Sequence, residues 1–195
     1  MSRQLSLFTA GELPPAVDDL EGLLAGPAHL VRRPDAARLS LVVGVEWRVA
    51  VLLAAFADRG LEGERTTTHD GRSVVRTPFS SRLLPLAGRW TRGARMVAPD
   101  GLRLDGSRLR LWTVAAGRPD EYGYLLALPD DDDGTWSAVG SALHDAGVPG
   151  TLIGVRAGGP AFRITGRRVS RLGELVGDPP LDAAVDAWPL IGGRP

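Results

Sequence analysis

Leu39 to Thr77, LSLVVGVEWRVAVLLAAFADRGLEGERTTTHDGRSVVRT, is the stretch of sequence that decides the fold. The same order of residue types returns from Leu126 to Ile164 at a constant offset of 87. Gly60, for example, corresponds to Gly147. This internal repeat predicts two copies of one fold unit, packed about a pseudo-twofold axis.

Each copy contains one clear amphipathic helix. Val49, Leu52, Leu53 and Phe56 follow the i, i+3, i+4, i+7 spacing of a helix with one apolar face. The corresponding residues in the second copy are Trp136, Val139, Gly140 and Leu143. The helices are therefore predicted over residues 46–59 and 135–145.

The remaining elements follow from turn residues and from alternating apolar positions. Asp70-Gly71 is a strong signal for a tight hairpin turn. In the first copy we predict helices at 16–25 and 80–87, strands at 29–33 and 38–43, and a hairpin at 64–69 and 72–77. In the second copy we predict helices at 91–98 and 167–176, and strands at 102–104, 109–114, 122–128, 151–156 and 161–165.

The predicted fold class is α+β, with two helix-strand-strand-helix-strand-strand-helix units in tandem. The predicted boundaries are an N-terminal peptide at 1–15, the two repeats at 16–88 and 89–177, and a C-terminal tail at 178–195. We expect Trp188 of the tail to pack back onto the domain.

The composition excludes several classes of protein. An apolar fraction of 44% and a charged fraction of 24% are ordinary for a globular protein of 195 residues. There is no apolar run long enough to cross a bilayer, no secretory signal, and no cysteine for disulfides or thiolate metal sites. We therefore expect a cytoplasmic protein without a membrane partner.

The net charge of zero hides an uneven distribution of arginine, which is the only cationic residue besides histidine. Residues 65–118 contain 11 Arg and 3 acids, and residues 156–171 contain 5 Arg and no acid. Residues 119–155 contain 7 acids and no Arg. This distribution permits a basic face that could hold a phosphate backbone, although arginines scattered over the surface would give the same counts.

The N-terminal peptide carries a short motif, Gln4-Leu5-Ser6-Leu7-Phe8. It resembles the motif by which bacterial polymerases and repair proteins dock on the DNA sliding clamp. The resemblance implies that Leu7 and Phe8 enter an apolar pocket while the Gln4 amide forms hydrogen bonds beside it. A buried amide selects its site sharply, because it must find a matching partner there. The alternative is that Leu5, Leu7 and Phe8 alternate as an edge strand of the domain's own sheet.

The order of the repeated elements resembles that of LAGLIDADG homing endonucleases and of the related N-terminal domain of WhiA-type regulators. The segments that carry this resemblance are 20–27 (LEGLLAGP), 91–101 (TRGARMVAPDG) and 162–168 (FRITGRR). The resemblance implies that the leading helices of the two copies pack together, each ending in an acid that binds a divalent metal. Here Gly26-Pro27-Ala28 replaces the first acid, and only Asp100 is offered for the second. We therefore expect no metal site and no enzyme.

In this family the DNA-facing surface is the side of the sheets that faces away from the helices. If Val75 and Phe162 face the helices, the alternation of a strand points Arg76 and Arg163 toward DNA. Such contacts would be mostly with phosphates. Further candidate DNA contacts, at strands or strand ends, are Arg65, Arg108, Arg110 and Arg156. For each arginine, a surface salt bridge is the alternative.

No other set of residues indicates catalysis or a cofactor. The three histidines share no ligand spacing, and a phosphate loop is excluded because the chain has no lysine. The acids at 130–133 are interpreted as the solvated start of a helix. We expect a non-enzymatic accessory protein of replication or repair that docks on the sliding clamp, with double-stranded DNA as a further partner. The alternatives are a WhiA-like DNA-binding regulator and a divergent LAGLIDADG-type nuclease.

Overall fold

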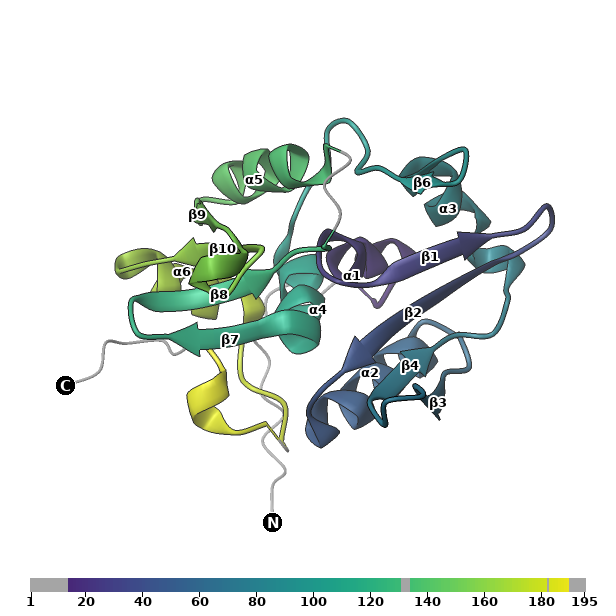
Figure 1. The fold of residues 1–195 in the computed structure, drawn as a ribbon, viewed down its shortest axis with the longest axis horizontal. Coiled ribbons are helices and arrows are strands. Elements are labelled where there is room, and N and C mark those ends of the chain that lie inside the picture. Colours follow the sequence, from purple (N-terminus) through teal and green to yellow (C-terminus); the bar gives the residue numbers. More distant parts are fainter. Residues whose placement is uncertain (1–13, 131–133, 182, 190–195) are drawn as a thin grey trace, which may run out of the picture.

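The computed structural model describes residues 14–130, 134–181 and 183–189. Two four-stranded antiparallel sheets lie side by side, and the helices cover one face of each sheet (Figure 1). The strand orders are β1-β2-β4-β3 and β7-β8-β10-β9, so the two sheets have the same topology. The predicted fold class, a tandem α+β repeat, is confirmed.

The first half contains one copy of the repeated elements. Its elements are η1 (Val17–Leu20), α1 (Glu21–Ala25), β1 (His29–Arg32), β2 (Ala37–Val43), α2 (Glu46–Asp58), β3 (Glu64–Thr67), β4 (Ser73–Arg76), η2 (Ser81–Leu83) and α3 (Leu84–Trp90). All of them were predicted within a few residues.

The second half contains the other copy, preceded by a small hairpin and followed by one short turn. Its elements are β5 (Thr91–Arg92), β6 (Arg95–Met96), α4 (Gly106–Ala116), β7 (Gly117–Asp120), β8 (Gly123–Ala127), α5 (Thr135–Asp145), β9 (Thr151–Ile153), η3 (Val155–Ala157), β10 (Ala161–Ile164), α6 (Arg167–Val176) and η4 (Val185–Ala187).

The start of the second half was predicted wrongly. Residues 91–98 were expected to be the leading helix, but they contain the β5–β6 hairpin, which turns at Gly93 with φ of 63°. The leading helix is instead α4, where a strand was predicted at 109–114. The alternating leucines of that segment imitate a strand, but the helix is buried on most sides, so no amphipathic pattern marks it. The N-cap at Asp105, whose side chain accepts from the Arg108 N–H, was the signal that could have located it.

The two leading helices, α1 and α4, pack together at the centre of the molecule (Figure 1). Their contact requires glycine. A Cβ at Gly22 would lie 1.9 Å from the Arg108 carbonyl oxygen, and one at Gly26 would lie 2.6 Å from Cδ1 of Trp112. The repeat is therefore joined by backbone-to-backbone contact between one helix of each half.

Each sheet consists of two hairpins, β1–β2 and β3–β4 in the first sheet and β7–β8 and β9–β10 in the second. The offset of 87 holds for the strand pairing within each hairpin but not for the pairing between the two hairpins of a sheet. In the first sheet Leu41 lies opposite Val75. The residue corresponding to Val75 is Phe162, which lies opposite Leu126 rather than Leu128. The second sheet has thus slipped by two residues between β8 and β10. A slip of two keeps every side chain on its original face, because the period of a strand is two.

The core lies between the sheets and the helices and includes side chains from both halves. Trp188 is buried as predicted, and its indole N–H donates to the Gly177 carbonyl oxygen at 2.8 Å. None of the helices in the described ranges has the length and apolar character needed to cross a bilayer.

Candidate nucleic-acid interface

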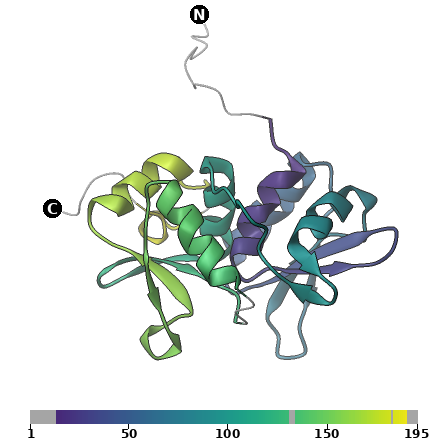
Figure 2. The ribbon, with the colours of Figure 1, turned by 90° about the horizontal axis from the view of Figure 1, so that it is seen from above.

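Each sheet has an inner face, packed on the helices, and an outer face on the opposite side. In β2 the buried residues Leu39, Leu41 and Val43 belong to the inner face, and the residues between them belong to the outer face. Figure 2 shows the two sheets on one side of the molecule and the helices on the other. The β3–β4 turn and the β9–β10 loop both project on the sheet side, away from the helices, one from each half of the molecule.

Arg76 and Arg163 lie on the outer faces of β4 and β10, as predicted from the alternation. Each forms an ion pair with a carboxylate of its own sheet. Arg76 Nε is 2.7 Å from Glu64 Oε1, and Arg163 Nε is 2.6 Å from Asp120 Oδ2. The Arg163 guanidinium also lies 5.3 Å from the centre of the Tyr122 ring. Their charges are therefore partly neutralised within the protein.

Arg65 lies on the other face of the first sheet. It is opposite Val75, an inner-face residue, so its side chain points toward α2. There it forms an ion pair with Glu46 and donates to the Ser73 hydroxyl. Arg65 was expected to be a further DNA contact, but its side chain lies on the opposite face of the sheet from Arg76, because successive side chains of a strand alternate between the two faces.

Arg108 belongs to the contact between the two halves. Glu21 of α1 is only 6% exposed, and its carboxylate accepts from the Nε atoms of Arg108 and Arg89, each at 3.0 Å. The Trp90 indole N–H donates to the same carboxylate at 3.3 Å. This network crosses from α1 to α3 and α4. Arg108 lies on the leading helix of the second half and not on a strand.

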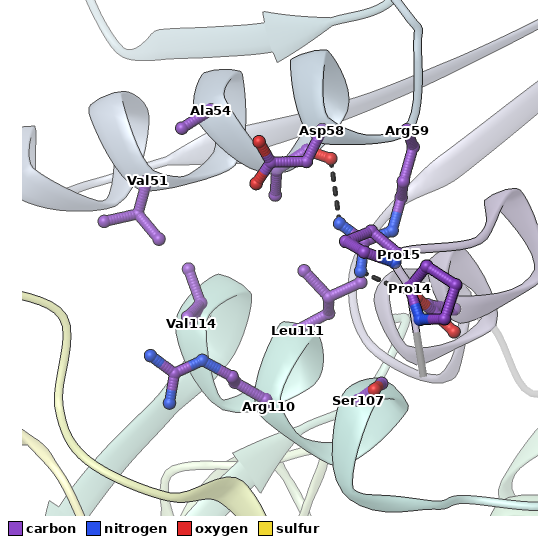
Figure 3. Close-up of a pocket in the computed structure, with 12 residues that line it drawn as sticks. Pro14, Pro15, Val51, Ala54, Asp58, Arg59, Ser107, Arg110, Leu111 and Val114 are labelled. Carbon is purple, nitrogen blue, oxygen red and sulfur yellow. Dashed lines mark hydrogen bonds and ion pairs between the residues drawn. The ribbon is translucent and has the colours of Figure 1, made fainter. Parts of the chain in front are cut away.

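Arg110 lies on the helix side of the molecule. Its guanidinium donates to the carbonyl oxygens of Val176 and Asp178, both at 2.6 Å, and lies 5.3 Å from the Trp188 ring. Figure 3 shows it at the edge of a cleft between α2 and α4. The cleft has a volume of about 480 Å³, and most of its lining residues belong to α2 and α4.

Arg156 lies in η3, in the loop between β9 and β10, and is exposed. Of the six predicted contacts, the structure therefore brings Arg76, Arg163 and Arg156 to the outer side of the sheets. Arg65, Arg108 and Arg110 are directed toward helices. The clamp motif, residues 4–8, lies outside the described residues.

A cationic and aromatic cluster on the first outer face was missed from the sequence. The guanidinium of Arg33 lies 3.7 Å from the centre of the Phe79 ring, and that of Arg38 lies 4.6 Å from it. The three residues come from the ends of β1 and β2 and from the segment after β4. Sequence patterns could not find this cluster, because Phe79 reaches Arg38 only through the pairing of β2 with β4, and the two residues are about 40 positions apart in the chain.

The C-terminal ends of α1 and α4 meet the sheets at the centre of the molecule. The residues there are Ala25-Gly26-Pro27-Ala28 in the first half and Val114-Ala115-Ala116-Gly117 in the second. Neither segment contains a carboxylate. Asp100, the expected acid of the second half, is exposed and precedes the N-terminal end of α4.

A buried cation, Arg48 of α2, occupies the C-terminal end of α4. Its Nη1 donates to the carbonyl oxygens of Thr113 and Val114 at 3.2 and 2.6 Å, and its Nη2 donates to that of Gly117. Burial lowers the pKa of this guanidinium below its ordinary value. A cation is favourable here because the carbonyl groups at a helix C-terminus carry partial negative charge.

The fold is similar to that of two solved structures. One is the homing endonuclease I-WcaI bound to its DNA recognition sequence, with a TM-score of 0.61 and 10% identity over 81% of this chain and 78% of that chain. The other is the N-terminal LAGLIDADG domain of DUF199/WhiA, with a TM-score of 0.56 and 12% identity over 84% of this chain and 82% of that chain. At these identities the likeness establishes a LAGLIDADG-type fold. The sequence matches no protein-family model and no curated protein.

This comparison contradicts the expectation that the chain is not an enzyme. That expectation rested on the missing acids of the leading helices, whereas a neighbour over most of the chain is a nuclease. The divalent metal implied by the fold family does not fit the helix ends, because neither end contains a carboxylate and the carbonyl groups at the end of α4 are already bound to Arg48. Among the described residues, no group of three His, Cys, Asp or Glu side chains could hold a metal ion.

Proposed function

We propose that this protein binds double-stranded DNA along the side of the molecule formed by the two outer faces. The observation that carries the proposal is the placement of Arg76 and Arg163 on matched strands of two sheets that lie on one side of the molecule. The two similar structures support it, since one of them is bound to its DNA recognition sequence.

Arginines on this side suit a phosphate backbone. Guanidinium groups bind phosphate oxygens with two parallel hydrogen bonds, and the counterions that they displace from DNA add to the affinity. The ion pairs of Arg76 and Arg163 are each with a single carboxylate. The Arg76–Glu64 pair is the more exposed of the two, and exposed pairs contribute less than about 1 kcal/mol, whereas the Arg163–Asp120 pair is partly buried. A phosphate group can therefore compete with Glu64 for Arg76 more readily than with Asp120 for Arg163.

A gel-shift assay with a duplex of about three helical turns tests the proposal. The wild-type protein should shift the duplex, and the affinity should fall steeply as salt is raised. The double variant R76E/R163E should bind much more weakly. The control is Arg171→Glu, which reverses one charge on α6 at the helix side of the molecule. Absence of any shift at low salt would remove the proposal.

Two functions are compatible with this binding surface, regulation of transcription and cleavage of DNA. Selection of bound duplexes from a random pool would give one preferred sequence for a WhiA-like regulator. Incubation of plasmid with the protein and Mg²⁺ or Mn²⁺ would give nicked or linear product for a LAGLIDADG-type nuclease. Both outcomes are compatible with the binding surface described above.

A second candidate partner is the DNA polymerase sliding clamp, and the observation that favours it is the sequence Gln4-Leu5-Ser6-Leu7-Phe8. Docking there would place a replication or repair accessory protein on DNA. A pull-down with purified clamp tests it. Binding should be lost in L7A/F8A and retained in Leu181→Ala, which removes a fully exposed leucine elsewhere. A clamp that fails to bind the wild type would eliminate this partner.

A further inference from the structure

The two outer faces differ in chemistry at positions related by the repeat. At three positions on β2, β3 and β4 the first sheet has a cationic, a hydroxyl and an aliphatic side chain, all partly exposed. The second sheet has three apolar side chains at the corresponding positions, and they form a small buried cluster of their own. The corresponding pairs are Arg38 and Leu125, Thr66 and Ile153, and Val74 and Ala161.

The second outer face is closed by the loop between β9 and β10. Arg118 of β7 donates to the Gly158 carbonyl oxygen in that loop. Because β7 and β9 are the opposite edges of their sheet, the Arg118 side chain and the loop together cross the outer face of β8 and β10. Leu125 and Ala161 beneath them are 1% and 0% exposed.

The first outer face is open. Val31 and Val42 are 46% and 38% exposed there. Arg33 and Arg38 form no ion pair with any described carboxylate. The Nε atom of Arg38 is buried and has no hydrogen-bond partner within the described ranges. The protein itself therefore does not neutralise the two positive charges on this face.

The Arg33–Phe79–Arg38 cluster holds two positive charges close to one aromatic ring. The ring attracts each guanidinium, by about 0.5–1 kcal/mol at an exposed site. The two charges repel each other, and neither guanidinium forms an ion pair in the described part of the chain that would relieve the repulsion. A phosphate group supplies the missing negative charge and accepts hydrogen bonds from both guanidinium planes. The cluster thus has the chemistry of a phosphate contact.

We propose that the first sheet carries most of the DNA contacts of this protein, with Arg33 and Arg38 holding a backbone phosphate beside Phe79. The second sheet contributes fewer contacts, because much of its outer face is occupied by its own loop. This inference rests on the proposed function, since it assigns the contacts of the same bound duplex. The expected footprint is asymmetric and covers about one helical turn, ~10 bp.

Fluorescence anisotropy with a labelled duplex tests the inference by removing two charges from either sheet. R33A/R38A should weaken binding at least about tenfold and reduce the salt slope by about 1, because one phosphate contact is lost. The matched variant R156A/R163A should also weaken binding, but by clearly less than R33A/R38A does. Phe79→Leu should weaken binding while every charge is retained, and Arg33→Ala alone, at an exposed position, guards against misfolding of the double variant.

The outcomes separate this inference from the function on which it rests. Equal losses in the two double variants, or a hydroxyl-radical footprint of two equal halves, would overturn the one-sheet inference and leave DNA binding intact. A wild-type protein that binds no duplex at low salt would remove the proposed function itself. A larger loss in R33A/R38A with a one-turn footprint supports the inference.

Discussion

The first and second sheets have the same topology, yet their outer faces have opposite character. In the first sheet Arg38 lies on an open face, and in the second the corresponding Leu125 is buried beneath a loop. The inner faces of both sheets are apolar, because each packs against a helix. The repeat has therefore kept the apolar residues that the core requires, whereas the faces without helices have diverged. Four pairs of variants test this difference between the two sheets and the packing that joins them.

The largest effect is expected where the halves join, at Gly22. Gly22→Ala places a methyl group 1.9 Å from the Arg108 carbonyl oxygen, so the two leading helices must separate. Overpacking of this kind should lower the free energy of unfolding by about 3 kcal/mol. Gly88→Ala is the control, since it is also helical and has open space around it. Urea denaturation measures both, and equal stability of the two variants would mean that the helices do not pack as described.

The next effect is expected in the buried cluster of the second outer face. Leu125→Ala should cost about 2.5 kcal/mol, because it removes a buried side chain and leaves a cavity. Arg38→Ala, at the corresponding position of the first sheet, should cost less than about 1 kcal/mol. Thermal or urea unfolding gives both values. Similar losses in the two variants would show that the outer faces are alike.

A smaller effect is expected in the loop that closes the second face. A Cβ at Gly159 would lie 2.2 Å from the Ile153 carbonyl oxygen, so Gly159→Ala should displace the loop at a cost of about 2 kcal/mol. Gly154→Ala, in the same loop, meets nothing within 4 Å and should cost less than about 0.5 kcal/mol. Binding of a hydrophobic dye should rise only in the first variant. A dye signal that does not distinguish them would mean that the loop does not cover the cluster.

The smallest effect is expected from releasing the paired arginines. Glu64→Gln frees Arg76 on the open sheet and should raise the affinity for duplex DNA about threefold at low salt. Asp120→Asn frees Arg163 on the closed sheet and should change it less than about twofold. Anisotropy titrations measure the difference. A larger gain from Asp120→Asn would place the contacts on the second sheet instead.

Much of the fold was predictable because local patterns and the repeat agree. The helix from Glu46 and the hairpin at Asp70-Gly71 each have a strong signal of their own, and the offset of 87 carried both into the second half. The prediction failed for α4, since a helix buried on most sides has no polar face to mark its period. It also placed Arg108 and Arg110 on strands, because both lie in that same segment.

The DNA-facing arginines were only partly predictable. Alternation along a strand placed Arg76 and Arg163 on the outer face, because the face of a side chain depends on parity alone. Their partners Glu64 and Asp120 depend on which strands pair, and so does the meeting of Arg33, Arg38 and Phe79. No local pattern contains that information.

The amino-acid sequence by itself determined that this protein is a doubled α+β unit, because periodicity, turns and repetition are properties of neighbouring residues. Only the tertiary structure decided which arginines are held by carboxylates, that Arg48 binds the carbonyl groups at the end of α4, and that one sheet is open and the other closed. Those features arise from contacts between segments far apart in the chain. Which distant residues meet depends on how the whole core packs and not on their neighbours in the sequence.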